Sequence, residues 1–195
     1  MKKNRWNILW GCGLCLATVL PGKSEAVVKL GQSCALTGST ASLGQEMNRG
    51  AMAYFTAHAG DEVELIVRDD GYEPTRCLEN TETFLHDGVD ALFGYVGTPT
   101  SKVALPLAMQ RNMLFFAPFT GATFLSDAEK NPYSFAIRAS YDTEVENMIR
   151  HLKEDLGITR IGLFVQRDDF GVAGVQAAVL AQEKVGGIDI VPPVP

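Results

Sequence analysis

The sequence predicts an α/β fold: a parallel sheet flanked by helices, followed by the beginning of a second unit of the same kind. Three observations predict it. Short apolar segments rich in β-branched and aromatic residues alternate with segments that repeat apolar residues at helical spacing. The loops that follow several of the apolar segments are rich in Gly, Ser and Thr. With 46% hydrophobic residues and a formal net charge of -6, the 195-residue chain has the composition of a globular protein.

Residues 1–26 are predicted to be a signal peptide. Residues 2–5 hold three basic side chains, an apolar run extends over 6–20, and Ser24-Glu25-Ala26 places small residues at -3 and -1 of a cleavage site. This pattern indicates a cleavable export signal. A membrane anchor or a buried first helix is the alternative, although the run is short for a membrane span. Cys12 also raises a lipoprotein signal, which the bulky residue two positions before it fits poorly.

Residues 27–140 are predicted to form an N-terminal lobe with the order βαβαβαβ. Each expected helix repeats apolar residues three or four positions apart, and each expected strand is a short run of apolar residues. Because the strands alternate with helices, they are expected to be parallel, with helices on both faces. The expected strands and helices, in chain order, are 27–35, 43–59, 63–67, 75–86, 91–95, 99–110 and 113–117.

The alternation breaks after residue 117 and then restarts. The interruption is rich in loop residues, with a short helical turn expected near Leu125 and an extended segment at 134–138. Residues 141–195 are predicted to begin a C-terminal lobe, and the boundary falls at 139–143. Two strands and two helices are too few to cover a parallel sheet, so the sequence is interpreted as a truncated protein. The elements expected there are 144–156, 160–166, 172–185 and 188–191.

Composition and cysteine spacing argue against several classes of function. Residues 1–26 hold four basic residues and one acidic residue, and no Lys/Arg run follows them, so nucleic acid and anionic membrane surfaces are poor partners. Cys34 and Cys77 can pair in an exported protein, or each can be a small buried side chain. No CxxC, HExxH or nucleophile elbow is present. The sequence therefore predicts no metal, no cofactor and no enzyme.

Three loops rich in Gly, Ser and Thr follow strands of the predicted sheet. They are "CALTGSTASLG", "GTPTS" and "APFTGAT". Open α/β sheets bind ligands at the carboxyl ends of their strands. Thr98 is expected to cap a helix whose first residue is Pro99 and whose free N–H groups favour a carboxylate or a phosphate. A capped helix without any ligand explains the Thr-Pro pair as well. The first loop is no P-loop, because it has no lysine.

Asp69 and Asp70 invite comparison with a phospho-acceptor or metal site. Such a site needs a further acid after the first strand, where Cys34 and its neighbours stand instead. We therefore expect the two carboxylates to cap the helix that starts near Thr75 and to pair with Arg68 or Arg76. Asp168-Asp169 has the same interpretation. Each of the three histidines is expected at a helix C-terminus, on the surface; they are His58, His86 and His151.

Several motifs in order resemble the periplasmic substrate-binding receptors of ABC transporters, and specifically the leucine/isoleucine/valine-binding, type I family. The motifs are "DDGYEP", "ALFGYVGTPTS", "APFTGATFL", "IRASYDTE" and "VQRDDFGVAG", and the resemblance extends from Val27 to about Gly187. It implies the type I periplasmic-binding-protein fold, in which two lobes close on a ligand. It also implies that the crossover at 139–143 is a hinge strand, and that no catalysis takes place.

The resemblance further implies the ligand-binding positions. Residues after the third strand would hold a carboxylate. The loop after the fourth strand would meet an ammonium group with a carbonyl and a hydroxyl. The first loop would cross the pocket mouth, and an aromatic residue of the second lobe would close over the ligand. These positions are Ser42, Leu43, Val96, Gly97, Thr98, Phe119, Thr120, Gly121 and Phe170.

The implied function is a monomeric, exported receptor in the periplasm that delivers a small-molecule ligand to ABC permease subunits. An amino acid of the branched-chain kind, or a similar small carboxylate or amide, is the expected ligand. Leu43 and Phe170 depart from the family, whose branched-chain binders commonly have tyrosine there. One alternative is a ligand-sensing subunit that acts on a regulator or signalling receptor. An exported flavodoxin-like enzyme is another, and it would need a catalytic set.

Overall fold

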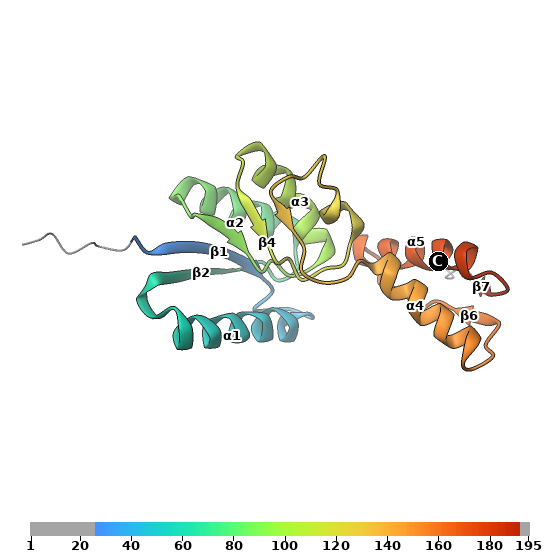
Figure 1. The fold of residues 1–195 in the computed structure, drawn as a ribbon. Coiled ribbons are helices and arrows are strands. Elements are labelled where there is room, and N and C mark those ends of the chain that lie inside the picture. The colour runs from blue at the N-terminus through green and yellow to red at the C-terminus, as the bar shows by residue number, and fades with distance from the viewer. Residues whose placement is uncertain (1–25, 192–195) are drawn as a thin grey trace, which may run out of the picture.

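The computed structural model describes residues 26–191 and shows a parallel five-stranded sheet followed by a parallel two-stranded sheet (Figure 1). The strand order of the larger sheet is β2-β1-β3-β4-β5. Its strands are β1 (Val28–Cys34), β2 (Val63–Asp69), β3 (Ala91–Phe93), β4 (Leu114–Phe116) and β5 (Ser134–Phe135). The smaller sheet pairs β6 (Arg160–Gly162) with β7 (Asp189–Val191). The predicted α/β fold with a parallel sheet is confirmed, while the predicted signal peptide lies outside the described residues except for Ala26.

Helices lie on both faces of the larger sheet, as expected for parallel strands joined by crossovers (Figure 1). One face carries α1 (Ala41–His58), and the other carries α2 (Pro74–Asp87) and α3 (Thr98–Gln110). The core lies on the second side, where Phe84 of α2 and Leu105 of α3 pack with Leu92 and Phe115 of the sheet. Short 3-10 turns, η1 (Gly60–Glu62) and η2 (Thr123–Ser126), complete this part. The second turn confirms the one expected near Leu125.

The two cysteines of the described residues are separate buried thiols and do not form a disulfide. Cys34 and Cys77 are both fully buried and both free. Burial, with a smaller contribution from the charge of Asp70, raises the pKa of each thiol to about 12. Neither thiol is poised for reaction, because the thiolate is the nucleophile and these groups stay protonated. Of the two sequence interpretations, separate buried side chains is the one that the structure has.

The second part of the chain is a small α/β unit. It contains α4 (Tyr141–Glu154) and α5 (Asp169–Val185) with β6 and β7. Ile149, Ala178, Ala181, Ile188 and Ile190 form its buried cluster. Within residues 26–191, no helix is long and apolar enough to cross a membrane. That this small α/β unit belongs to a C-terminal lobe over residues 141–195 stays a prediction.

The ends of several elements differ from the sequence prediction for local reasons. The third strand ends at Phe93 because Gly94 turns to a φ of 62°. The helices α4 and α5 begin three residues earlier than expected. In each case a capping side chain extends the first turn: Ser140 accepts from the N–H of Thr143, and Asp168 accepts from the N–H groups of the next turn. The expected strand at 160–166 ends at Gly162, which pairs with the last described residue, Val191.

Candidate ligand-binding site

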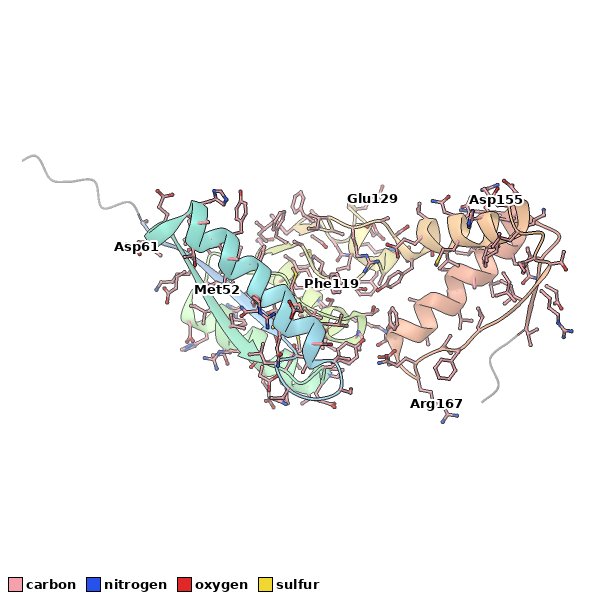
Figure 2. All side chains as sticks on the ribbon, turned by 90° about the horizontal axis from the view of Figure 1, so that it is seen from below. Met52, Asp61, Phe119, Glu129, Asp155 and Arg167 are labelled. Carbon is pink, nitrogen blue, oxygen red and sulfur yellow. The ribbon has the colours of Figure 1, made fainter. Side chains whose placement is uncertain are left out.

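A cavity of about 160 Å³ lies between the carboxyl edge of the larger sheet and the first turns of α4 and α5. Figure 2 shows Phe119 in the middle of the molecule, between the part with Met52 and Asp61 and the part with Asp155 and Arg167. Phe119 and Phe170 are each about two-fifths exposed, so apolar rings face the opening. The cavity is lined by Thr40, Leu43, Tyr72, Val96, Gly97, Thr98, Phe119, Arg138, Tyr141, Gln166 and Phe170.

Four helices begin at this cavity. Thr40 is the N-cap residue of α1, Thr98 and Tyr141 are the first residues of α3 and α4, and Phe170 is the second residue of α5. A helix N-terminus has unpaired N–H groups and a partial positive charge. Ser140 and Asp168 cap α4 and α5, whereas α1 and α3 have no side-chain cap, so the ends of α1 and α3 are the ones that favour an anion in the cavity. The Oγ1 of Thr40 is also buried without a hydrogen-bond partner, so the wall contains a free hydroxyl group.

Gly97 brings the backbone of one loop against the ring of Tyr72. Its φ is 114° and its ψ is 151°, a combination that is essentially restricted to glycine. A Cβ atom at this position would lie 2.5 Å from Cε2 of Tyr72 and 2.8 Å from the Thr100 hydroxyl. Tyr72 itself has a φ of 68°. Two unusual backbone conformations therefore meet at the cavity wall. Such conformations are common at functional sites.

The hydroxyl of Thr98 belongs to a chain of three. It lies 2.7 Å from the hydroxyl of Thr120, which lies 3.1 Å from the phenol of Tyr141. The hydroxyl of Thr120 also accepts from the N–H of Ala122. The prediction that Thr98 caps the helix is wrong, because Gly97 is the N-cap residue and no side chain caps this end. The Thr98 hydroxyl instead forms a hydrogen bond with that of Thr120, which follows the neighbouring strand β4.

The structure places the predicted site residues in two groups. Leu43, Val96, Gly97, Thr98, Phe119 and Phe170 line the cavity, whereas Ser42, Thr120 and Gly121 do not. Ser42 is exposed on the first turn of α1. Thr120 lies behind Thr98 and is fully buried. Gly121 contacts the crossover, since its carbonyl accepts from the N–H of Tyr141 and a Cβ atom there would lie 2.7 Å from the carbonyl oxygen of Ala139.

Sequence reasoning missed Arg138, the only charged residue among the described residues that line the cavity. Its guanidinium carbon lies 5.5 Å from the ring centroid of Phe119 and 5.4 Å from that of Tyr141. Its Nη2 donates to both carboxylate oxygens of Glu144, at 2.6 and 2.8 Å. The available signal was a basic residue directly before the predicted boundary at 139–143. Thr40, Tyr72, Tyr141 and Gln166 were also missed, because each lies in a loop or at a helix start.

Two aspartates at the end of β2, Asp69 and Asp70, hold the loops behind the cavity. Asp69 pairs with Arg76 at 2.9 Å, as expected, but the N-cap residue of α2 is Glu73, and no side chain caps that end. Asp69 accepts from the N–H groups of the first loop and of Gly71. Asp70, fully buried, accepts from the N–H of Tyr72 at 2.8 Å. The predicted helix cap is therefore wrong: the carboxylates hold the turn that presents Tyr72.

Polar contacts also connect the two parts of the chain beside the cavity. Lys102 of α3 forms an ion pair with Asp169 at the start of α5. Burial, together with the charge of Asp168, raises the pKa of the Tyr72 phenol. The phenol therefore stays neutral and can donate a hydrogen bond.

No group of three or more His, Cys, Asp or Glu side chains in the described part of the chain could hold a metal ion.

The chain is similar to periplasmic binding proteins in sequence and in structure. Residues 27–195 match the family described as periplasmic binding protein. Leu/Ile/Val-binding protein homolog 2 of Brucella abortus (strain 2308) is 29% identical over 117 residues, which cover 56% of this chain and 32% of that protein. A possible leucine/isoleucine/valine-binding protein from Rhodopirellula baltica SH 1 is 32% identical with a TM-score of 0.75, covering 85% of this chain and 48% of that one.

A further solved structure shares the fold alone. The fatty acid ABC transporter substrate-binding protein from Thermomonospora curvata is 23% identical with a TM-score of 0.77, covering 89% of this chain and 46% of that one. The chain spans about half the length of these solved structures. The resemblance stated from the sequence motifs is confirmed by the family match over nearly the whole chain. The chain belongs to the periplasmic binding protein family, a family of solute-binding proteins, and is similar to its Leu/Ile/Val-binding members.

Proposed function

We propose that this protein is an exported solute-binding receptor of an ABC transporter and acts in the periplasm. Its ligand is an amino acid of the branched-chain kind or a similar small carboxylate or amide. The observation that carries the proposal is the cavity itself, at which four helices begin and which apolar rings surround. Family membership supports the class of function.

The cavity suits a small ligand with an anionic end and an apolar body. Its volume of about 160 Å³ is well below the roughly 300–1,000 Å³ of pockets for drug-sized molecules. The first turn of α3 offers N–H groups and the Thr98 hydroxyl for the anionic end. If Thr98 accepts the proton of Thr120 in their 2.7 Å hydrogen bond, its own proton is free for the ligand. Leu43, Phe119 and Phe170 surround the apolar body.

Residues from both parts of the chain line the same cavity, as a receptor that closes on its ligand requires. Val96 and Thr98 come from the larger sheet and α3, whereas Tyr141 and Phe170 come from the first turns of α4 and α5. The ligand would thus join the two parts, and the closed form would dock on permease subunits. We expect saturable binding without turnover.

The test is Thr98→Val, which keeps the shape of the side chain and removes the hydroxyl. Isothermal titration calorimetry with L-leucine, L-valine and 3-methylbutanoate measures affinity in the parent and in the variant. A hydrogen bond to a charged group contributes about 1.5–3 kcal/mol, so the bound ligand should lose roughly 10- to 150-fold in affinity. Thr83→Val is the matched control, since Thr83 on α2 does not line the cavity. Equal affinity in the parent and Thr98→Val would contradict the assigned site.

A further inference from the structure

We propose that Arg138 is a ligand-binding residue that pairs with the carboxylate of a small ligand whose body is apolar or aromatic. This inference rests on the proposed function and names the chemistry that selects the ligand. Arg138 is the only charged residue among the described residues that line the cavity. Its environment determines which of its nitrogens remain available.

Two aromatic rings restrict the orientation of the guanidinium. Phe119 lies in the loop after β4 and Tyr141 is the first residue of α4, and the guanidinium carbon is within 5.5 Å of both ring centroids. At this distance a cation is attracted by the faces of the rings. The two ring contacts hold the guanidinium beside the cavity. Because the N–H groups of arginine all lie in the guanidinium plane, the edges are where a carboxylate binds.

Glu144 uses only one nitrogen of Arg138. Both of its carboxylate oxygens accept from Nη2, and no carboxylate of the described residues lies within hydrogen-bond distance of Nε or Nη1. The two side chains are each one-third exposed, so their ion pair contributes little to stability. Its effect is to hold the guanidinium in place before a ligand arrives, which lowers the cost of binding.

Two carboxylates near the cavity are already engaged by donors. Glu144 is occupied by Arg138, and Asp168 accepts from Gln166 and from the N–H groups of Phe170 and Gly171. The remaining wall is formed by aromatic and aliphatic side chains, neutral hydroxyls and the amide of Gln166. A positive edge beside the uncapped N-termini of α1 and α3 and an apolar wall fits one carboxylate on an apolar body.

The experiment compares carboxylates with their neutral amides. Calorimetry measures the affinities of three matched pairs for the purified full-length protein: L-leucine and L-leucinamide, 3-methylbutanoate and 3-methylbutanamide, and benzoate and benzamide. We expect Arg138→Gln to weaken the bound carboxylate at least 10-fold and its amide less than twofold. Arg138→Lys should be intermediate, since it keeps the charge but loses the planar fork. Arg150→Gln is the matched control, because Arg150 pairs with glutamates of α4 away from the cavity lining.

Two further outcomes separate this inference from the proposed function. Carboxylate binding that falls in Thr98→Val but stays within twofold of the parent in Arg138→Gln overturns the role of Arg138 alone. Equal losses for a carboxylate and its amide also overturn it, because they show a packing role. Failure of every carboxylate to bind the parent counts against both proposals. If Arg138→Gln does not fold, Arg138→Lys decides, because it keeps the charge and loses the planar fork: the carboxylate should bind more weakly than in the parent while its amide does not, and an unchanged carboxylate affinity contradicts the inference.

Discussion

Gly97→Ala tests whether the loop after β3 shapes the cavity. The backbone at this position, with φ 114° and ψ 151°, is essentially restricted to glycine, and a residue with a side chain there costs about 1–3 kcal/mol. The added Cβ would also lie 2.5 Å from the ring of Tyr72 and 2.8 Å from the hydroxyl of Thr100. Overpacking of this kind costs about 1–3 kcal/mol. The expected loss in the free energy of unfolding is therefore about 2–6 kcal/mol.

Thermal unfolding monitored by circular dichroism measures this loss. For a chain of this length, 1 kcal/mol corresponds to roughly 2–4 °C, so Tm should fall by about 4–24 °C. Gly50→Ala is the matched control, because Gly50 is exposed within α1 and a Cβ atom there meets nothing within 4 Å. That substitution should stabilise the protein by about 0.5–1 kcal/mol.

Ligand affinity provides the second measurement. Displacement of Tyr72, which lines the cavity, by the new methyl group should weaken the binding of the carboxylate bound by the parent, whereas Gly50→Ala should leave its affinity unchanged. A Gly97→Ala variant that unfolds within about 1 °C of the parent would refute the reasoning, because it would show that the loop relaxes without cost.

The remaining predictions concern the residues that support the cavity. Burial raises the pKa of Asp70 in the folded protein above its ordinary 3.8, so the folded state binds its proton more tightly than the unfolded state does. The free energy of unfolding should therefore fall as the pH rises above about 3.8. In urea titrations at several pH values, Asp70→Asn should lack this pH-dependent decrease. An identical pH profile of stability in the parent and the variant would contradict the prediction. Asp69 has the opposite sign. Its burial alone would raise its pKa, but hydrogen bonds from Thr37, Leu36, Gly71 and Arg76 outweigh burial and lower it, so its stabilisation is present above pH 3.8 and is lost only at lower pH. Asp168→Ala removes the cap from the helix that carries Phe170 and should cost about 0.5–2 kcal/mol in urea denaturation, whereas Asp168→Asn keeps an acceptor and should stay close to the parent. Equal stabilities of these two variants would show that the cap contributes nothing.

Local patterns predicted the elements well, because their causes lie within a few residues. The alternation of strand and helix, the helix C-terminal positions of His58, His86 and His151 and the turn near Leu125 are all present. Helix starts were less accurate at Ser140 and Asp168, whose caps add a turn that apolar periodicity does not show. The loops rich in Gly and Thr were correctly expected at one edge of the sheet, because all parallel strands end there.

Only the tertiary structure decided which side chains share the cavity. Thr98 and Thr120 are 22 residues apart in the chain, and their hydroxyls meet because β3 and β4 are neighbours in the sheet. Tyr72 reaches Gly97 through a turn held by buried Asp70, and Arg138 lies near two rings from separate elements. The sequence by itself determined the fold class, the family resemblance and the loops that surround the cavity. The partners of each polar group, and with them the chemistry of the wall, depend on distances across the fold that no local pattern encodes.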